Sequence, residues 1–512
     1  MRRRISPSPG YRKSSRFSWL LYVVAPLLLF SVSCSSTETI VVGDQARSVE
    51  TEDTRETEPQ KEIVLKIGDH RPISSFDPLF ALNTSDRRVI GLIYEGLVRF
   101  NEQENVVPAL AKKWEISEDS LTYTFTLRRS AFYHDDESFL QGRGRRIHSN
   151  DVLKVFERMA SRDVPPDAAE LFRETILGFD AFFLEQREVY LPRKRQMETI
   201  PGIEVLSDST IAFHLFDPDP EFLYKLASPY AVIYPEEPFR FRDSGLHTRA
   251  VGSGPFRHHS SIGDSIHIFL RNDYYPHFSE RENDQYVQRI ELLNTENETR
   301  LYSLFTRNKL DILFDLGPQS IQTIINEEHT LVEELRLFYS VLAVPNPEPL
   351  IAYYNHRNRY GLTMKDASAS LRNVQQDTLR ALSGNPSLTV EFLHDEYSTL
   401  NVANVFRTFG HGQRFRLITA YNQGLHQQTI SSLIHRLFAS NLDTAIMQRP
   451  VFSRDMFIYL DEVPVFVPGK KVAPKDHEVF RMYSYRYIMY NNSISGIKTN
   501  GLAWWIDLSG VR

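Results

Sequence analysis

The residues with the clearest capacity for chemistry lie in the segment Tyr133-His-Asp-Asp-Glu137, whose imidazole and carboxylates could ligate a metal ion. A turn whose carboxylates are solvated is a better interpretation of this segment than a metal site. The pair His258-His259 is a poor alternative, because adjacent residues of a strand point to opposite faces. The chain has no His-Glu-x-x-His, Gly-x-Ser-x-Gly or Walker sequence. We therefore expect no enzyme, no metal and no cofactor.

Cys34 is the only cysteine in 512 residues, so neither an intrachain disulfide nor thiol catalysis is expected. It follows a basic stretch over 1–16 and an apolar run over 19–30, the order found in secretory signals. Ser31-Val-Ser-Cys34 resembles a bacterial lipobox, although Ser31 stands where leucine is usual. The sequence predicts a lipoprotein signal peptide over 1–34 and an exported chain, periplasmic or on the outer face of the cell membrane, anchored by lipid on Cys34. An uncleaved anchor is the alternative.

Composition limits what the rest of the chain can be. Residues 35–61 are rich in Ser, Thr and Glu, and they predict a disordered tether. Residues 62–512 are long enough for two or three domains. The formal net charge of −6 leaves no basic surplus for a nucleic-acid partner. No later apolar run has the length of a second membrane segment.

Hydrophobic periodicity predicts the elements that would position any site. Apolar residues alternate with threonine from Leu121 to Leu127, which predicts a half-buried strand. Apolar residues then recur at helical spacing over 149–159, and Ser149 and Asn150 could cap this helix. The stretch 202–215 is typical of two strands joined by a turn. The pattern over 286–315 predicts a strand, a helix and a strand, the unit of a parallel sheet.

Several of these segments occur together in a recognisable order. They include Pro108-Ala-Leu-Ala111, Thr122-Tyr-Thr-Phe-Thr-Leu-Arg128, Phe132-Tyr-His-Asp135 and Val251-Gly-Ser-Gly-Pro-Phe256. The ordered set resembles the extracytoplasmic solute-binding proteins, family 5, of the peptide and nickel ABC-transporter class. The resemblance continues to Ile506-Asp-Leu-Ser509, so it covers nearly the whole exported chain.

This resemblance implies an α/β chain with the two-lobed periplasmic-binding-protein fold, type II, of the large peptide-binding class, with a cleft between the lobes. It implies a first lobe over 62–285, a second lobe over 286–460 and a return to the first lobe over 461–512. The second lobe is shortened and divergent. The aspartate that grips a peptide α-amine in peptide-binding members has no secure counterpart, and Asp455 is only a weak substitute.

In the family, solute lies where strand ends of the two lobes face each other. The resemblance therefore implies ligand contacts at Ser253, Gly254, Asp315, Asn355 and Arg449. A guanidinium at Arg449 could bind a carboxylate or phosphate with two hydrogen bonds. Equally, Arg449 could pair with a nearby acid and order its loop, and the loop of Gly254 could be a turn packed on a neighbouring element.

The resemblance implies the substrate-binding component of an ABC transporter, which binds an oligopeptide or similar small solute between its lobes and delivers it to permease subunits. A monomer is expected. The alternative is a degenerate paralogue that acts as a scaffold or sensor, and the shortened second lobe favours it. A hydrolase of exported peptides would lack a nucleophile or metal.

Overall fold

The computed structural model describes residues 62–354 except 82, 242–244, 264, 278–285 and 296, then 389–392, 415–419, 442–446, 456–462, 465–468, 470 and 478–512. The predicted signal peptide 1–34 with Cys34, the tether 35–61, and the candidate ligand residues Asn355 and Arg449 lie outside the described residues.

Strand β1 has a parallel partner on each side in the largest sheet. It spans Val64–Asp69 and pairs with β12 (Arg289–Asn294) and with β13 (Ile312–Phe314). Helix α7 (Glu298–Thr306) connects β12 to β13, as parallel strands require a crossover. The strand, helix and strand predicted over 286–315 are confirmed, as is the α/β class.

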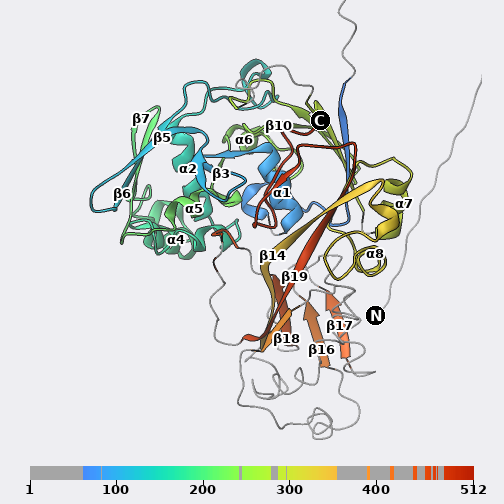
Figure 1. Cartoon of the computed structure of the whole chain (residues 1–512). Helices are drawn as coiled ribbons and strands as arrows, with labels where there is room; N and C mark the ends of the chain where they lie inside the picture. The colour runs from blue at the N-terminus through green and yellow to red at the C-terminus, as the bar shows by residue number, and fades with distance from the viewer. Residues whose placement is uncertain are drawn as a thin grey trace, which may run out of the picture. The chain divides into compact units, whose positions relative to one another are not determined.

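Two long strands connect the two halves of this sheet. Strand β14 (Tyr339–Tyr354) and strand β19 (Glu478–Asn491) are antiparallel neighbours along most of their lengths (Figure 1). One end of β19 pairs with β13, whereas the far end of β14 pairs with β18 (Met456–Glu462). The chain therefore leaves the neighbourhood of β1 along β14 and returns along β19.

The pairing differs from the expected crossing points near 286 and 461. Strands β12 and β13 come after position 286, yet both are hydrogen-bonded to β1. Strand β18 contains Asp461 and pairs with β14 rather than with β1. Short strands separated by helices have the same pattern in either lobe, so the sequence alone does not reveal their partners.

A four-stranded antiparallel sheet lies between these segments in the sequence. Its order is β5 (Ala111–Ile116), β6 (Thr122–Leu127), β8 (Thr210–His214) and β7 (Ile203–Ser207). The alternation predicted from Leu121 is confirmed, because Tyr123, Phe125 and Leu127 are buried and the threonines between them are half-buried.

Helix α2 (Ser149–Met159) packs on this sheet, and its Phe156 ring lies 5.2 Å from the ring of Phe213 in β8. The helix is confirmed, but its cap differs from the expected one. The Asp151 carboxylate accepts the backbone N–H of His148 at 2.9 Å, whereas the Ser149 hydroxyl donates to the carbonyl of Ser207. Asp151 provides the capping contact because the Ser149 hydroxyl already donates its hydrogen bond to β7.

The remaining elements are short. The other helices are η1 (Pro78–Phe80), α1 (Thr84–Ile93), η2 (Leu140–Gly142), α3 (Asp167–Glu170), α4 (Phe179–Glu188), η3 (Pro192–Lys194), α5 (Phe222–Leu226), η4 (Pro229–Ala231), α6 (Glu237–Phe241), α8 (Pro318–Ile324) and η5 (Glu333–Leu335). The other strands are β2 (Glu95–Gly96), β3 (Val98–Phe100), β4 (Val106–Pro108), β9 (Val232–Ile233), β10 (Phe256–Ile262), β11 (Ile266–Arg271), β15 (Thr389–Phe392), β16 (Phe415–Thr419), β17 (Leu442–Ile446), β20 (Lys498–Thr499) and β21 (Ile506–Asp507). Among the described residues, no helix has the length and apolar character to cross a membrane.

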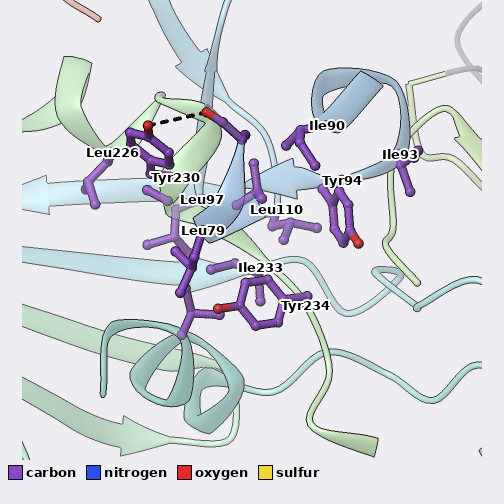
Figure 2. Close-up of a cluster of buried hydrophobic side chains, with 14 of the residues drawn as sticks. Leu79, Ile90, Ile93, Tyr94, Leu97, Leu110, Leu226, Tyr230, Ile233 and Tyr234 are labelled. Carbon is purple, nitrogen blue, oxygen red and sulfur yellow. Dashed lines mark hydrogen bonds between the residues drawn. The ribbon is translucent and has the colours of Figure 1, made fainter. Parts of the chain in front are cut away.

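Helix α1 is buried on both its apolar and its polar sides. Figure 2 shows Ile90, Ile93 and Tyr94 in the core formed with neighbouring loops and strands. Yet Arg87 and Arg88 are also only 1% and 3% exposed. A helix that buries charged residues needs partners for them. Those partners define the candidate site.

Candidate functional site

Eight ionisable side chains gather at the carboxyl ends of β1 and β13. This carboxyl-edge cluster consists of Asp69, His70, Arg71, Arg87, Arg88, Asp315, Glu348 and Arg486, each at most 4% exposed. They come from the ends of β1 and β13, from α1, and from the long strands β14 and β19. In open sheets of α/β proteins, ligands bind at the carboxyl ends of parallel strands.

Asp315 lies at the centre of the cluster. Both carboxylate oxygens accept hydrogen bonds from Arg88, each at 2.9 Å, and Arg486 donates a third at 3.2 Å. The Arg71 guanidinium lies 3.7 Å away. Asp315 has a φ of 50°, an uncommon conformation that aspartate tolerates better than most residues. Burial alone would raise the pKa of Asp315, but Arg88, Arg486 and Arg71 hold it well below its usual range.

Glu348 belongs to the cluster and lies at an irregular part of β14. The register of β14 against β19 shifts between Asn346 and Leu350, and such bulges redirect side chains. One oxygen of Glu348, Oε2, accepts a hydrogen bond from Arg87 at 2.7 Å and one from the Thr84 hydroxyl at 3.3 Å. The other oxygen, Oε1, is buried and has no hydrogen-bond partner among the residues that the structure describes. A buried carboxylate oxygen without a donor costs free energy that a bound donor would recover.

Asp69 and His70 form the edge of the cluster next to β1. Asp69 accepts the backbone N–H of Arg71 at 2.9 Å and the Ser85 hydroxyl at 2.6 Å. Burial and the neighbouring Asp315 carboxylate raise the pKa of Asp69. Burial and Arg71 lower the pKa of His70 to about 3, so His70 is neutral near pH 7. The Nε2 atom of His70 is buried without a hydrogen-bond partner.

The cluster holds four guanidinium groups and the three carboxylates Asp69, Asp315 and Glu348, and Asp86 of α1 is a further buried carboxylate close to Arg87. Within the described residues, the Oε1 atom of Glu348 is the carboxylate oxygen of this cluster that is buried without a hydrogen-bond donor. This oxygen favours a ligand with a hydrogen-bond donor, such as an ammonium group.

Helix α1 sets the position of the two arginines. Asn83 caps the helix by accepting the backbone N–H of Asp86 at 2.8 Å, and Asp86 holds Ser74 through two hydrogen bonds of 2.8 and 2.5 Å. This fixed first turn directs Arg87 toward β14 and Arg88 toward the end of β13. Burial raises the pKa of Asp86 to about 6, although these hydrogen bonds oppose the shift.

The predicted site residues Ser253 and Gly254 lie apart from Asp315, on a loop packed against the end of α1. The Gly254 N–H donates to Ile93 at 2.8 Å, and its carbonyl accepts from His134 and from Asn272. This N–H group is therefore engaged within the chain. The Ser253 hydroxyl is buried without a partner, next to a cavity of about 10 Å³, enough for one water molecule.

Replacing Gly254 with alanine should lower the free energy of unfolding by about 1–3 kcal/mol, because the new methyl would lie 2.7 Å from the Ile93 carbonyl carbon. Urea denaturation measures the change. Gly91→Ala is the matched control, since a methyl there meets nothing within 4 Å. Equal stability of both variants would contradict this packing role.

The segment Tyr133–Glu137 is occupied with internal contacts. Asp136 accepts the backbone N–H of Ser138 at 3.0 Å and forms an ion pair with Arg249 at 3.1 Å. His134 is tied to the Gly254 carbonyl. In the described ranges, no three His, Cys, Asp or Glu side chains are arranged to hold a metal ion.

Sequence reasoning identified Asp315 but missed its partners. Arg88, Glu348 and Arg486 are far apart in the sequence, and each alone is typical of a solvated surface. One signal was available: Glu348 lies between Pro347 and Pro349 within an otherwise apolar strand pattern, where proline marks a bulge or an edge.

Comparisons with known proteins identify the family of the chain. Residues 105–368 match the family described as bacterial extracellular solute-binding proteins, family 5. The dipeptide-binding protein of Escherichia coli is 30% identical over 174 residues, 32% of this chain and 29% of that protein. The dipeptide-binding protein DppE of Bacillus subtilis is 24% identical over 315 residues, 60% of this chain and 52% of that protein. These matches span about a third to a half of the relatives' lengths.

Solved structures show the same fold over a longer stretch. A periplasmic oligopeptide-binding protein of Borrelia burgdorferi aligns with a TM-score of 0.68 at 16% identity, covering 88% of this chain and 100% of that chain. Haemophilus influenzae OppA, in complex with RPPGFSPFR, aligns with a TM-score of 0.68 at 14% identity, covering 88% and 99%. The expected fold is confirmed, and a solute-binding family confirms the expectation of a non-enzyme. The family pattern covers more than half of the sequence, and the chain belongs to the bacterial extracellular solute-binding proteins, family 5.

Proposed function

We propose that the protein is the substrate-binding component of an ABC transporter and that its solute is a peptide. Three findings support this: the family, the likeness to peptide-binding relatives, and the carboxyl-edge cluster. The observation that carries most weight is the buried Glu348 Oε1 atom, which has no hydrogen-bond donor among the described residues. A peptide brings an α-ammonium group that can donate to this oxygen.

The peptide α-ammonium binds Glu348 Oε1 in this proposal. Hydrogen bonds between charged groups are about twice as strong as neutral ones. Glu348 thereby takes the role for which the sequence offered no secure residue. Asp315 holds Arg88 and Arg486 in place, and Asn355 and Arg449 stay predicted ligand contacts.

Closure of two lobes around β14 and β19 is part of the proposal. These are the long strands that connect the two halves of the sheet, and the carboxyl-edge cluster includes one residue from each of them, Glu348 and Arg486. Ligand contacts made by both lobes exist only in the closed form, so binding shifts the equilibrium toward closure. The surface of the closed form then delivers the solute to permease subunits.

The N-terminus completes the proposed arrangement. Export through the signal at 1–34, lipid on Cys34 and the tether 35–61 would hold a monomeric receptor at the membrane, on its periplasmic or outer face. The support is the basic stretch, the apolar run and the single cysteine in that order.

Calorimetric titration of the exported chain with unmodified peptides of two to nine residues tests the function. We expect saturable binding of one peptide. N-acetylation of that peptide should weaken it ten- to hundredfold, because a charge-assisted contact is worth about 1.5–3 kcal/mol. Glu348→Gln should weaken the unmodified peptide by a similar factor.

The control is Glu236→Gln, which changes an exposed acid paired with Arg240. Circular dichroism at the titration temperature confirms that each variant is folded. Wild-type affinity in Glu348→Gln would remove Glu348 from the site. Absence of binding for every peptide would contradict the proposed function.

A further inference from the structure

A cavity of about 300 Å³ lies between α1, the β3–β4 hairpin and the C-terminal segment, and Arg88 is the one residue that it shares with the carboxyl-edge cluster. Its volume is at the lower end of the range for small-ligand pockets. One face of α1 forms part of the wall through Arg88, Gly91 and Leu92, which follow at helical spacing, and Glu95 of β2 adds to the lining. Nothing in the proposed peptide function uses this cavity.

The Glu95 carboxylate lines the cavity and is buried, with 5% of the residue exposed. It accepts a hydrogen bond from the Tyr275 hydroxyl at 2.6 Å. The Arg99 guanidinium lies 3.9 Å away, longer than a hydrogen bond. Burial raises the pKa of Glu95, and the nearby Asp507 carboxylate raises it further, against opposing effects of Arg99 and Tyr275.

Asp507 adds a second carboxylate to the same wall. It accepts the backbone N–H of Ser509 at 2.8 Å and forms no ion pair within the described part of the chain. The remaining charges of the lining are compensated: Lys498 lies 3.5 Å from Glu102, and Arg88 is bound to Asp315. The lining thus has one more carboxylate than its cations compensate.

Aromatic rings line the cavity beside these carboxylates. Phe100, Tyr275, Trp504 and Trp505 all contribute, and the Phe100 and Trp504 rings pack edge to face at 6.1 Å. Aromatic faces attract cations, most strongly those of tryptophan, and they also pack against a flat apolar body. An uncompensated carboxylate next to aromatic walls is the chemistry that recognises an organic cation.

We propose that this cavity is a second binding site, separate from the peptide site, for a small organic cation with an aromatic or apolar body and one primary amine. The amine binds between Glu95 and Asp507, and the apolar body packs against Trp505 and Phe100. Leu92 and Gly91 of α1 form the opposite wall.

Tyramine is a suitable probe, with 4-ethylphenol as its uncharged counterpart and 3-(4-hydroxyphenyl)propionate as its anionic one. Calorimetric titration of the full exported chain should show tyramine binding at least tenfold tighter than either. Asp507→Asn should weaken tyramine at least tenfold. Equal affinity for the three probes, or no saturable binding of tyramine, would overturn the proposal.

Gly91 allows the cavity to be filled without disturbing its walls. A side chain there would start in open space, since an added Cβ meets no atom within 4 Å. Gly91→Leu should abolish tyramine binding, and Gly91→Ala, the matched control, should retain it. Both variants should bind peptide like the wild type. If Gly91→Leu bound tyramine like the wild type, the cavity would not be the tyramine site. If that variant lost peptide binding, the cavity and the peptide site would not be separate.

Discussion

Replacing Arg88 with methionine should lower the free energy of unfolding by about 3–5 kcal/mol, the usual cost of removing one partner from a buried ion pair. Arg88 donates both hydrogen bonds of a bidentate pair with Asp315, and both side chains are 3% exposed. Methionine retains much of the packing volume but leaves the Asp315 carboxylate with only Arg486 and Arg71 nearby. Urea denaturation followed by circular dichroism measures the loss.

The matched control is Arg240→Met. Arg240 pairs with Glu236 at 2.8 Å, but its side chain is 69% exposed. Exposed pairs contribute about 0–1 kcal/mol, so this variant should remain close to the wild type. If Arg88→Met lost less than the control, the carboxyl-edge cluster would not stabilise the fold.

Acidification should destabilise the wild type more than a variant that lacks His258. Burial, together with the nearby His267 and Arg249, lowers the pKa of His258 to about 3. An unfolded histidine titrates near 6.5, so between these values the unfolded chain binds a proton that the folded chain does not. The stability from neutral His258 is complete above pH 6.5 and is lost as the pH falls toward 3. From pH 6.5 to 4, the wild type should lose about 3 kcal/mol more than His258→Gln.

Urea denaturation at several pH values gives this difference, and the opposing titration of Asp86, whose pKa is raised to about 6, cancels in it. His259 provides the control, because it neighbours His258 in β10 but is exposed. His259→Gln should follow the wild-type pH dependence. Parallel curves for the wild type and His258→Gln would contradict the proposed burial of a neutral imidazole.

Local patterns predicted individual elements well. The alternation in β6 and the helical spacing in α2 determine which faces are buried, and those faces are the ones observed. The strand, helix and strand from β12 to β13 also followed from periodicity. Their pairing with β1 did not, because periodicity identifies a strand without naming its neighbour.

The candidate site was predicted only in part. Asp315 was found because it directly follows a strand. Glu348 was missed because its orientation depends on the bulge in β14, and Arg88 was missed because arginine on an amphipathic helix is normally exposed. For Gly254 the sequence allowed two interpretations, a contact with solute or a turn packed on a neighbouring element, and the missing side chain permits close packing on Ile93. Contacts between residues far apart in the sequence do not produce a periodic pattern, so periodicity cannot predict them.

The central claim is that this protein binds one peptide through the peptide α-ammonium. Native mass spectrometry of the exported chain, after exposure to a mixed digest of peptides, tests it most directly. The account predicts complexes heavier than the free protein by the mass of a single short peptide, and depletion of those complexes when the digest is N-acetylated. The claim would be contradicted by a spectrum that shows only the free protein. It would also be contradicted if the complexes were equally abundant with the acetylated and the unmodified digest.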